Sequence, residues 1–203
     1  MDEQYYEKLM NIKTSGEQKI FNESLHYNRY EPTSYTALEI LSEQYTFTAE
    51  DSIVDFGCGK GRFVFYINHF FSSAMTGIEM NKFFYTESVD NKRNYFKINK
   101  NKTDNIHFLN SFAEKYKINP SDNKFYFFNP FSVQIFAKVI KNILVSYEEY
   151  ERIVDIILYY PSDDYIYFLE TSTPFLLINE IKVSYLYDND NRHSFLIYRL
   201  GYR

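Results

Sequence analysis

The chain has 203 residues, enough for one domain of ordinary size with a sizeable core. Its formal net charge of −5 argues against binding to duplex nucleic acid, and its single cysteine excludes an internal disulfide framework. The N-terminal residues are too polar for a signal peptide and no run is long enough to span a membrane, so we expect a soluble, cytoplasmic protein.

The N-terminal part of the chain favours helices. Residues 1–45 are expected to form a helical extension or lid, and residues 46–203 one compact domain. Within the extension, Phe21 to Tyr30 predicts a short helix or an ordered lid over a ligand. Pro32 sets φ for the first turn of a further helix, a position that proline favours. The apolar residues that follow recur at helical spacing: Leu38, Leu41 and Tyr45.

The stretch Ile53–Arg62 is the most informative in the chain. A short apolar strand leads to Asp55 and then to a loop with the pattern G-x-G-x-G, made by Gly57, Gly59 and Gly61. Glycine allows a loop to approach a ligand closely and to adopt positive φ. The helix that follows presents its free N–H groups to that ligand. The sequence therefore predicts a ligand site at this loop.

The glycine spacing narrows the class of ligand. A dinucleotide fingerprint is G-x-G-x-x-G, one residue longer than the pattern here. A carboxylate at Asp55 would repel a pyrophosphate but suits a ligand that carries an amine or a sulfonium. The next predicted strand, Ala74–Glu79, ends in a second acid, about 20 residues after the loop, where a carboxylate can accept both hydroxyls of a ribose. These features disfavour a nicotinamide-dependent oxidoreductase.

Strands and helices alternate over the rest of the chain. Further strands are expected at 106–110, 125–128 and 153–160, and helices at 62–71, 82–98, 132–147 and 162–171. The chain is expected to close with an antiparallel pair, 178–187 and 194–199, across a turn rich in Asp and Asn. The predicted fold class is α/β: a mainly parallel seven-stranded sheet with helices on both faces and a C-terminal antiparallel hairpin.

Three short motifs, in this order, resemble those of the class I S-adenosylmethionine-dependent methyltransferases. Asp55 to Arg62 is similar to their first motif, Gly77-Ile78-Glu79 to the acidic end of their second strand, and Asn129-Pro130-Phe131 to their fourth motif. The resemblance extends in element order from Thr33 to Arg203. It implies a Rossmann-like fold, S-adenosylmethionine (SAM) as the cofactor, and methyl transfer as the activity.

The resemblance also implies which residues contact the cofactor. In this family a helix before the first strand helps to close the pocket, which makes Tyr30 and Thr33 candidates, although a simple helix start explains them equally well. Met80 can pack against an adenine or into the core, and Cys58 is a spacer between glycines. The expected contacts are Tyr30, Thr33, Asp55, Gly57, Cys58, Gly59, Gly61, Glu79, Met80, Ser111, Phe112 and Asn129.

Two positions depart from the family pattern. The acid that usually follows the third strand and binds the adenine amine falls on Ser111 or Phe112. The fourth motif, usually Asn-Pro-Pro-aromatic and associated with methylation of planar amines, has a single proline here. We expect Asn129, Pro130 and Phe131 to be the catalytic residues, with the Asn oxygen accepting a hydrogen bond from an amine and Phe131 stacking on a planar acceptor. A strand-ending turn also explains the Asn-Pro pair.

The sequence thus predicts a SAM-dependent methyltransferase that modifies a nitrogen of an unidentified acceptor. The alternative is a non-catalytic module that binds SAM or S-adenosylhomocysteine (SAH) and regulates a partner. Small molecule, protein and RNA all remain open as the acceptor. No metal is expected, because the four histidines are scattered without metal-ligand spacing.

Overall fold

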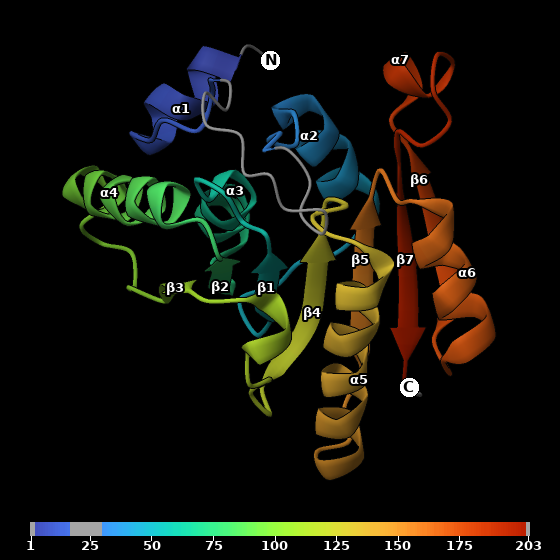
Figure 1. Cartoon of the computed structure of the whole chain (residues 1–203). Coiled ribbons are helices and arrows are strands. Elements are labelled where there is room, and N and C mark those ends of the chain that lie inside the picture. Colours follow the sequence, from blue (N-terminus) through green and yellow to red (C-terminus); the bar gives the residue numbers. More distant parts are fainter. Residues whose placement is uncertain (1–2, 17–29, 202–203) are drawn as a thin grey trace.

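The computed structural model describes residues 3–16 and 30–201. They contain a seven-stranded sheet in the order β3-β2-β1-β4-β5-β7-β6 (Figure 1). The strands are β1 (Ser52–Phe56), β2 (Ala74–Glu79), β3 (Ile106–Asn110), β4 (Asp122–Phe127), β5 (Val154–Tyr159), β6 (Leu176–Lys182) and β7 (Ser194–Leu200). β1 to β5 pair in parallel, whereas β7 runs antiparallel to both β5 and β6. The predicted fold class is confirmed.

Helices cover both faces of this sheet. One core cluster contains residues of α1 (Glu3–Met10), α2 (Tyr35–Gln44), α3 (Arg62–Phe71) and α4 (Lys82–Ile98), and the other contains residues of α5 (Val133–Glu149) and α6 (Asp163–Ser172). Successive side chains of a strand point to opposite faces. Tyr126 of β4 therefore joins the first cluster, and its neighbours Phe125 and Phe127 join the second. The last three residues of β4, Phe125 to Phe127, are aromatic and buried because both faces of the sheet are covered there.

Local capping fixes the starts of the helices near the candidate site. The Ser34 hydroxyl accepts a hydrogen bond from the amide of Ala37 and caps α2. The Asn81 side chain accepts one from the amide of Phe83 and caps α4. Such caps satisfy N–H groups that have no partner within the helix. Helix α3 instead starts directly after Gly61, whose φ of 89° lies in the left-handed region.

The predicted division at residue 45 stays a prediction. Helices α1 and α2 belong to the same core cluster as α3, so the described N-terminal residues pack against the domain rather than apart from it. Of the expected helix or lid from Phe21 to Tyr30, only Tyr30 lies within the described residues.

The predicted strand at 178–187 was wrong in its bounds. β6 ends at Lys182, and Ser184–Tyr187 forms a short helix, α7. The amide of Val183 makes the last ladder bond, to the His193 carbonyl at 2.9 Å, and the Val183 carbonyl then accepts the amides of Leu186 and Tyr187, each at 2.9 Å. The residues after Val183 therefore leave the sheet, because their backbone hydrogen bonds are made within the segment and not to a neighbouring strand.

The strand order places a topological switch point between β1 and β4. The chain moves outward in one direction from β1 to β2 and β3, and in the other from β4 to β5. Ligands of open α/β sheets bind in the crevice that such a reversal leaves at the carboxyl ends of the strands. Among the described residues, no helix is long and apolar enough to cross a bilayer.

Candidate functional site

A cavity of about 200 Å³ lies at the carboxyl ends of β1, β2 and β4, beneath the segment that precedes α2. Eight of the expected cofactor contacts line it: Tyr30, Thr33, Asp55, Gly57, Cys58, Glu79, Met80 and Ser111. Pro130 and Phe131 of the fourth motif line it as well. Gly59, Gly61, Phe112 and Asn129 are not among the lining residues. The switch point, the glycine loop and the two acids therefore meet at one cavity.

The glycine loop is fixed in place by backbone bonds. The amides of Gly57 and Cys58 both donate to the Ile78 carbonyl, at 2.9 and 3.1 Å, which ties the loop to β2. The amide of Gly61 donates back to the Cys58 carbonyl at 2.8 Å. Gly57 has a φ of 82°, and a Cβ at this position would lie 2.6 Å from the Cβ of Pro130. Only glycine permits this close approach between the first and fourth motifs.

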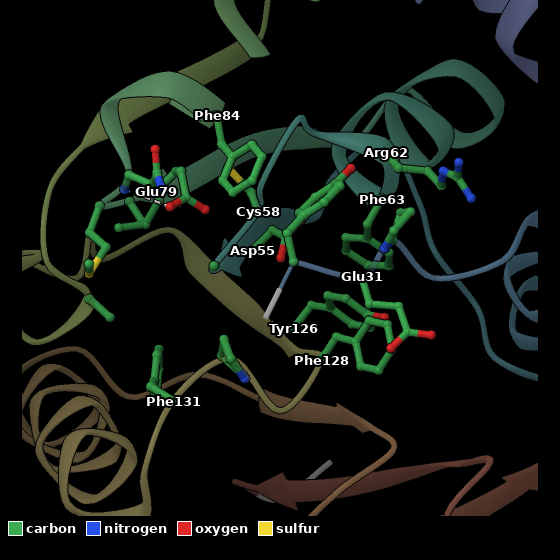
Figure 2. A pocket seen from close by; sticks show the side chains of 18 of the residues that line it. Glu31, Asp55, Cys58, Arg62, Phe63, Glu79, Phe84, Tyr126, Phe128 and Phe131 are labelled. Carbon is green, nitrogen blue, oxygen red and sulfur yellow. Dashed lines mark hydrogen bonds between the residues drawn. The ribbon is translucent and has the colours of Figure 1, made fainter. Parts of the chain in front are cut away.

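Asp55 is a buried acid without a hydrogen-bond or ion-pair partner among the described residues. Its side chain is 4% exposed, and it accepts no hydrogen bond and forms no ion pair with any described residue. Burial, together with the nearby charge of Glu79, raises the pKa of its carboxyl well above the usual 3.8. Figure 2 shows its carboxylate pointing into the cavity between Glu79 and Tyr126. A buried carboxylate is costly unless a ligand supplies the missing positive charge or donors.

Glu79 is buried too, but its orientation is fixed. Its Oε2 accepts the amide of Gly59 at 2.9 Å, and its Oε1 accepts the amide of Asn81 at 2.7 Å. Burial raises the pKa of Glu79, and these backbone bonds oppose that rise. A carboxylate has about four lone-pair sites, of which these two amides use two. The remaining sites can accept a pair of hydroxyl groups from a ligand.

Tyr30 covers the glycine loop from the other side. Its ring stacks on Phe84 with 4.6 Å between centroids, and its hydroxyl donates to the Thr14 carbonyl at 2.6 Å. A Cβ on Gly59 would lie 2.6 Å from the Cδ2 of Tyr30. The expectation that Tyr30 lies at the pocket is consistent with this placement, and its contact with a cofactor stays a prediction.

Arg62 joins the N-terminal residues to the site, which the sequence did not indicate. Its Nη1 lies 2.7 Å from the carboxylate of Glu3 and donates to the Thr33 carbonyl at 3.1 Å. Its Nε donates to the Thr14 hydroxyl at 2.7 Å, and its guanidinium lies 4.5 Å from the centre of the Tyr35 ring. The side chain is 4% exposed, and its Nη2 makes no hydrogen bond with the described residues but lies 3.5 Å from the Glu7 carboxylate. Helix α1 is thereby anchored to the start of α3.

The fourth motif is only partly available to an acceptor. Asn129 has a φ of 40°, an unusual value for a residue other than glycine, at the carboxyl end of β4. The Phe131 ring is 2% exposed and packs edge-on against Phe127, and its carbonyl accepts the Tyr165 hydroxyl. The ring thus offers little surface for the stacking we expected, because the α5 side of the core takes up most of it.

The position after β3 carries no carboxylate that faces the cavity. Ser111 lines the cavity, and its hydroxyl donates to the Phe112 carbonyl at 3.2 Å. Phe112 is 43% exposed and is not among the lining residues. The Asn110 amide beside them donates to the carbonyls of Glu79 and Met80. Of the two residues that take the place of the family's acid, Ser111 therefore lines the cavity, and the loss of a side-chain contact with an adenine amine stays a prediction.

Several lining residues were not expected from the sequence. They are Glu31, Pro32, Arg62, Phe63, Ile78, Asn81, Phe84, Ala113, Tyr126 and Phe128. Tyr126 stacks on Phe63 with 3.8 Å between centroids, and its hydroxyl lies 2.6 Å from that of Thr33. The Asn81 and Phe84 positions follow directly from the expected acid at the end of β2, so the chain order alone could have indicated them.

Comparison with known proteins supports this architecture at the level of the fold. No protein-family profile and no curated protein matches the sequence. An RNA methyltransferase from Salinibacter ruber, in complex with SAH, is 14% identical with a TM-score of 0.54, covering 84% of this chain and 92% of its own. A SAM-dependent methyltransferase from Thiobacillus denitrificans, also with SAH, is 10% identical with a TM-score of 0.53 over 84% and 92%. A protein of the NADB-Rossmann superfamily from Streptococcus agalactiae is 11% identical with a TM-score of 0.57 over 85% and 71%.

The fold is therefore that of the class I methyltransferases, a Rossmann-like α/β sheet closed by an antiparallel strand. At 10–14% identity this similarity shows the fold alone.

Proposed function

We propose that this chain is a SAM-dependent methyltransferase. The observation that carries the proposal is the buried Asp55 beside a glycine loop, unpaired among the described residues, with the fixed carboxylate of Glu79 at the end of the next strand. A cavity with these groups favours a ligand that has both a positive centre and a pair of hydroxyls. The two structurally similar methyltransferases named above were solved with SAH, a ligand with a protonated amine and a ribose.

Several of the residues that line the cavity would each have their own role in binding or catalysis. Bound SAM supplies an activated methyl group on a positively charged sulfur. Asp55 would hold a positive group of the cofactor, and Glu79 would accept the ribose hydroxyls. Tyr30 and Thr33 would close the cavity from the N-terminal side, and Met80 and Ser111 would border the base. The enclosing aromatic walls would exclude water and hold the acceptor in line with the methyl group.

The proposal extends to the atom that receives the methyl group, which would be a nitrogen. The methyl donor is already activated, so a nucleophile that brings its own lone pair needs little help from the protein. No histidine is found among the described residues that line the cavity. Asn129, between the lining residues Phe128 and Pro130, would accept a hydrogen bond from an amine and orient its lone pair. Small molecules, proteins and RNA are all candidate carriers of that nitrogen.

A second candidate is a module that binds SAM or SAH and transfers no methyl group. The buried ring of Phe131 favours it, because that ring leaves little surface for an acceptor. Product formation separates the two candidates: turnover with any acceptor would exclude the non-catalytic module.

The proposal is tested by calorimetric titration of the protein with SAM and SAH, followed by incubation with labelled methyl donor and fractionated cell extract. We expect micromolar binding of both ligands and transfer of label to one fraction. Asp55→Asn should weaken SAM binding by at least tenfold, whereas Asp90→Asn, a surface acid on α4 that pairs with Arg93, should not change it. Absence of binding at millimolar ligand would refute the proposal.

A further inference from the structure

The cavity has a second end, away from Glu79. Figure 2 shows Glu79 on one side of Asp55, and Glu31 with Phe128 on the other. Glu31 and Phe128 both line the cavity. If Glu79 takes the ribose, as proposed above, the Glu31 end is the side from which an acceptor can reach the methyl group. The inference below rests on that proposed function.

Glu31 places a carboxylate at this end. It is exposed, and it makes no hydrogen bond or ion pair with any described residue. Figure 2 shows its carboxylate beside the Phe128 ring, at the end of β4.

Aromatic rings form the wall next to this carboxylate. Phe128 is half-buried, and its centroid lies 4.7 Å from that of Tyr159 and 6.3 Å from that of Tyr160. Tyr160 has a φ of 50°, and Asn129, the residue after Phe128, has a φ of 40°. Backbone strain of this kind concentrates at functional sites. Faces of aromatic rings attract cations, most strongly where water is excluded.

Two described arginines near this end pair with carboxylates. The guanidinium of Arg62 contacts the carboxylates of Glu3 and Glu7, at 2.7 and 3.5 Å. Arg192 stacks on Tyr160 at 4.4 Å and pairs with Asp190 at 2.7 Å. Among the residues that the structure describes, no cation pairs with Glu31 or Asp55.

We propose that the Glu31 end of the cavity binds a cationic nitrogen group of the methyl acceptor, an alkylammonium or a guanidinium. Glu31 supplies the counter-charge, and the Phe128 ring supplies an apolar face that a cation favours. The same arrangement disfavours acceptors that carry phosphate at this point, because phosphate would meet two carboxylates. The acceptor would thus carry a cationic nitrogen group at this end of the cavity rather than a phosphate, and the atom that accepts the methyl group would be a separate, uncharged nitrogen.

The test uses small probes on the full chain saturated with SAH. Benzylamine, benzyl alcohol and benzoate share a ring and differ in charge, and their binding is followed by nuclear magnetic resonance. We expect benzylamine to bind at least tenfold more tightly than benzyl alcohol, and benzoate to bind more weakly than either. Glu31→Gln should remove most of the preference for benzylamine, and Phe128→Leu should weaken benzylamine binding severalfold. Glu50→Gln, at an exposed turn before β1, is the matched control and should change nothing.

The possible failures are distinguishable. If SAH binds but benzylamine is not preferred, or if Glu31→Gln leaves the preference intact, the inference is overturned and the proposed function stands. If Glu31→Gln instead weakens SAH and SAM binding, Glu31 holds the amine of the cofactor, and the assignment to the acceptor is overturned. If SAH does not bind at all, the proposed function fails and the inference fails with it.

Discussion

The ring of Tyr30 lies directly against the Cα of Gly59. A Cβ at Gly59 would lie 2.6 Å from the Cδ2 of Tyr30, and the Tyr30 hydroxyl is held by the Thr14 carbonyl. The glycine loop is therefore enclosed between β2 on one side and the N-terminal residues on the other. The N-terminal part of the chain thus forms one wall of the candidate site.

Gly59→Ala should abolish high-affinity binding of SAH. The new Cβ overlaps the Tyr30 ring, and a left-handed φ of 54° costs a residue other than glycine about 1 kcal/mol. We expect at least a tenfold loss of affinity by calorimetry. Gly16→Ala is the control: its φ is 105°, but the nearest atom to its Cβ is the flexible Lys60 Nζ at 3.8 Å. It should lower stability without changing affinity, and an equal loss of affinity in both variants would contradict the prediction.

The stability of the ligand-free protein should fall as pH rises through the mildly acidic range. The pKa values of Asp55 and Glu79 are raised, chiefly by burial, above the usual 3.8 and 4.5. Folded-state carboxyls with raised pKa bind protons more tightly than in the unfolded chain, so their contribution is greatest below those usual values and is lost as pH rises through the raised ones.

Asp55→Asn tests this pH dependence. The amide does not ionise, so the variant should show a flatter profile of unfolding free energy against pH, and above the raised pKa it should be more stable than the wild type. The measurement is denaturant unfolding between pH 4 and pH 8, with SAM affinity measured in parallel. Affinity should show the opposite trend, because the cationic ligand needs the ionised acid. A profile parallel to that of the wild type would exclude Asp55 as the titrating group.

Arg62→Gln should destabilise the fold by about 3 kcal/mol, since it removes a buried charge whose partners stay behind. The lost contacts include the Glu3 carboxylate and the Thr33 carbonyl. Because Thr33 lines the cavity, SAH affinity should fall as well. Arg93→Gln is the control: that side chain is 70% exposed and pairs with Asp90 on the same helix, so its loss should cost less than about 1 kcal/mol. Similar unfolding midpoints for the two variants would argue against an anchoring role.

Ser111→Asp should tighten SAH binding about fivefold, because it would restore a hydrogen-bond acceptor for the adenine amine at a position that lines the cavity. Phe112→Asp places the same carboxylate one residue later, on a side chain that is 43% exposed and outside the cavity, and should give no gain. The inosine analogue of SAH, which lacks the amine, should not gain from Ser111→Asp. Calorimetry on both ligands makes the comparison, and a gain for both ligands would show that the effect is not specific to the amine.

The mainly parallel α/β sheet and the positions of the two acids along the chain were predictable because they depend on short-range signals. Apolar strands that end in Asp55 and Glu79, and a glycine loop between strand and helix, are local patterns whose meeting point follows from a parallel sheet. The structure brings both acids to one cavity, as expected.

The remaining parts of the site depend on long-range packing, and they were missed for that reason. Glu31 and Phe128 come from segments far apart in the sequence, and nothing local in either indicates that they share a wall. The burial of Phe131 depends on how α5 and Tyr165 pack against β4. The helix at Ser184–Tyr187 has an apolar pattern that a strand would share, and only the backbone bonds to Val183 decide between them.

Strand β7 lies between β5 and β6 and pairs with both, which sets an order for folding during synthesis. Until residues 194–200 have left the ribosome, β6 lacks its partner strand. During that time one edge of β5 also stays open, although β5 is buried along its whole length in the finished protein. Nascent chains with such open apolar edges are prone to aggregate. A translational pause before β7 has emerged would therefore prolong the vulnerable state.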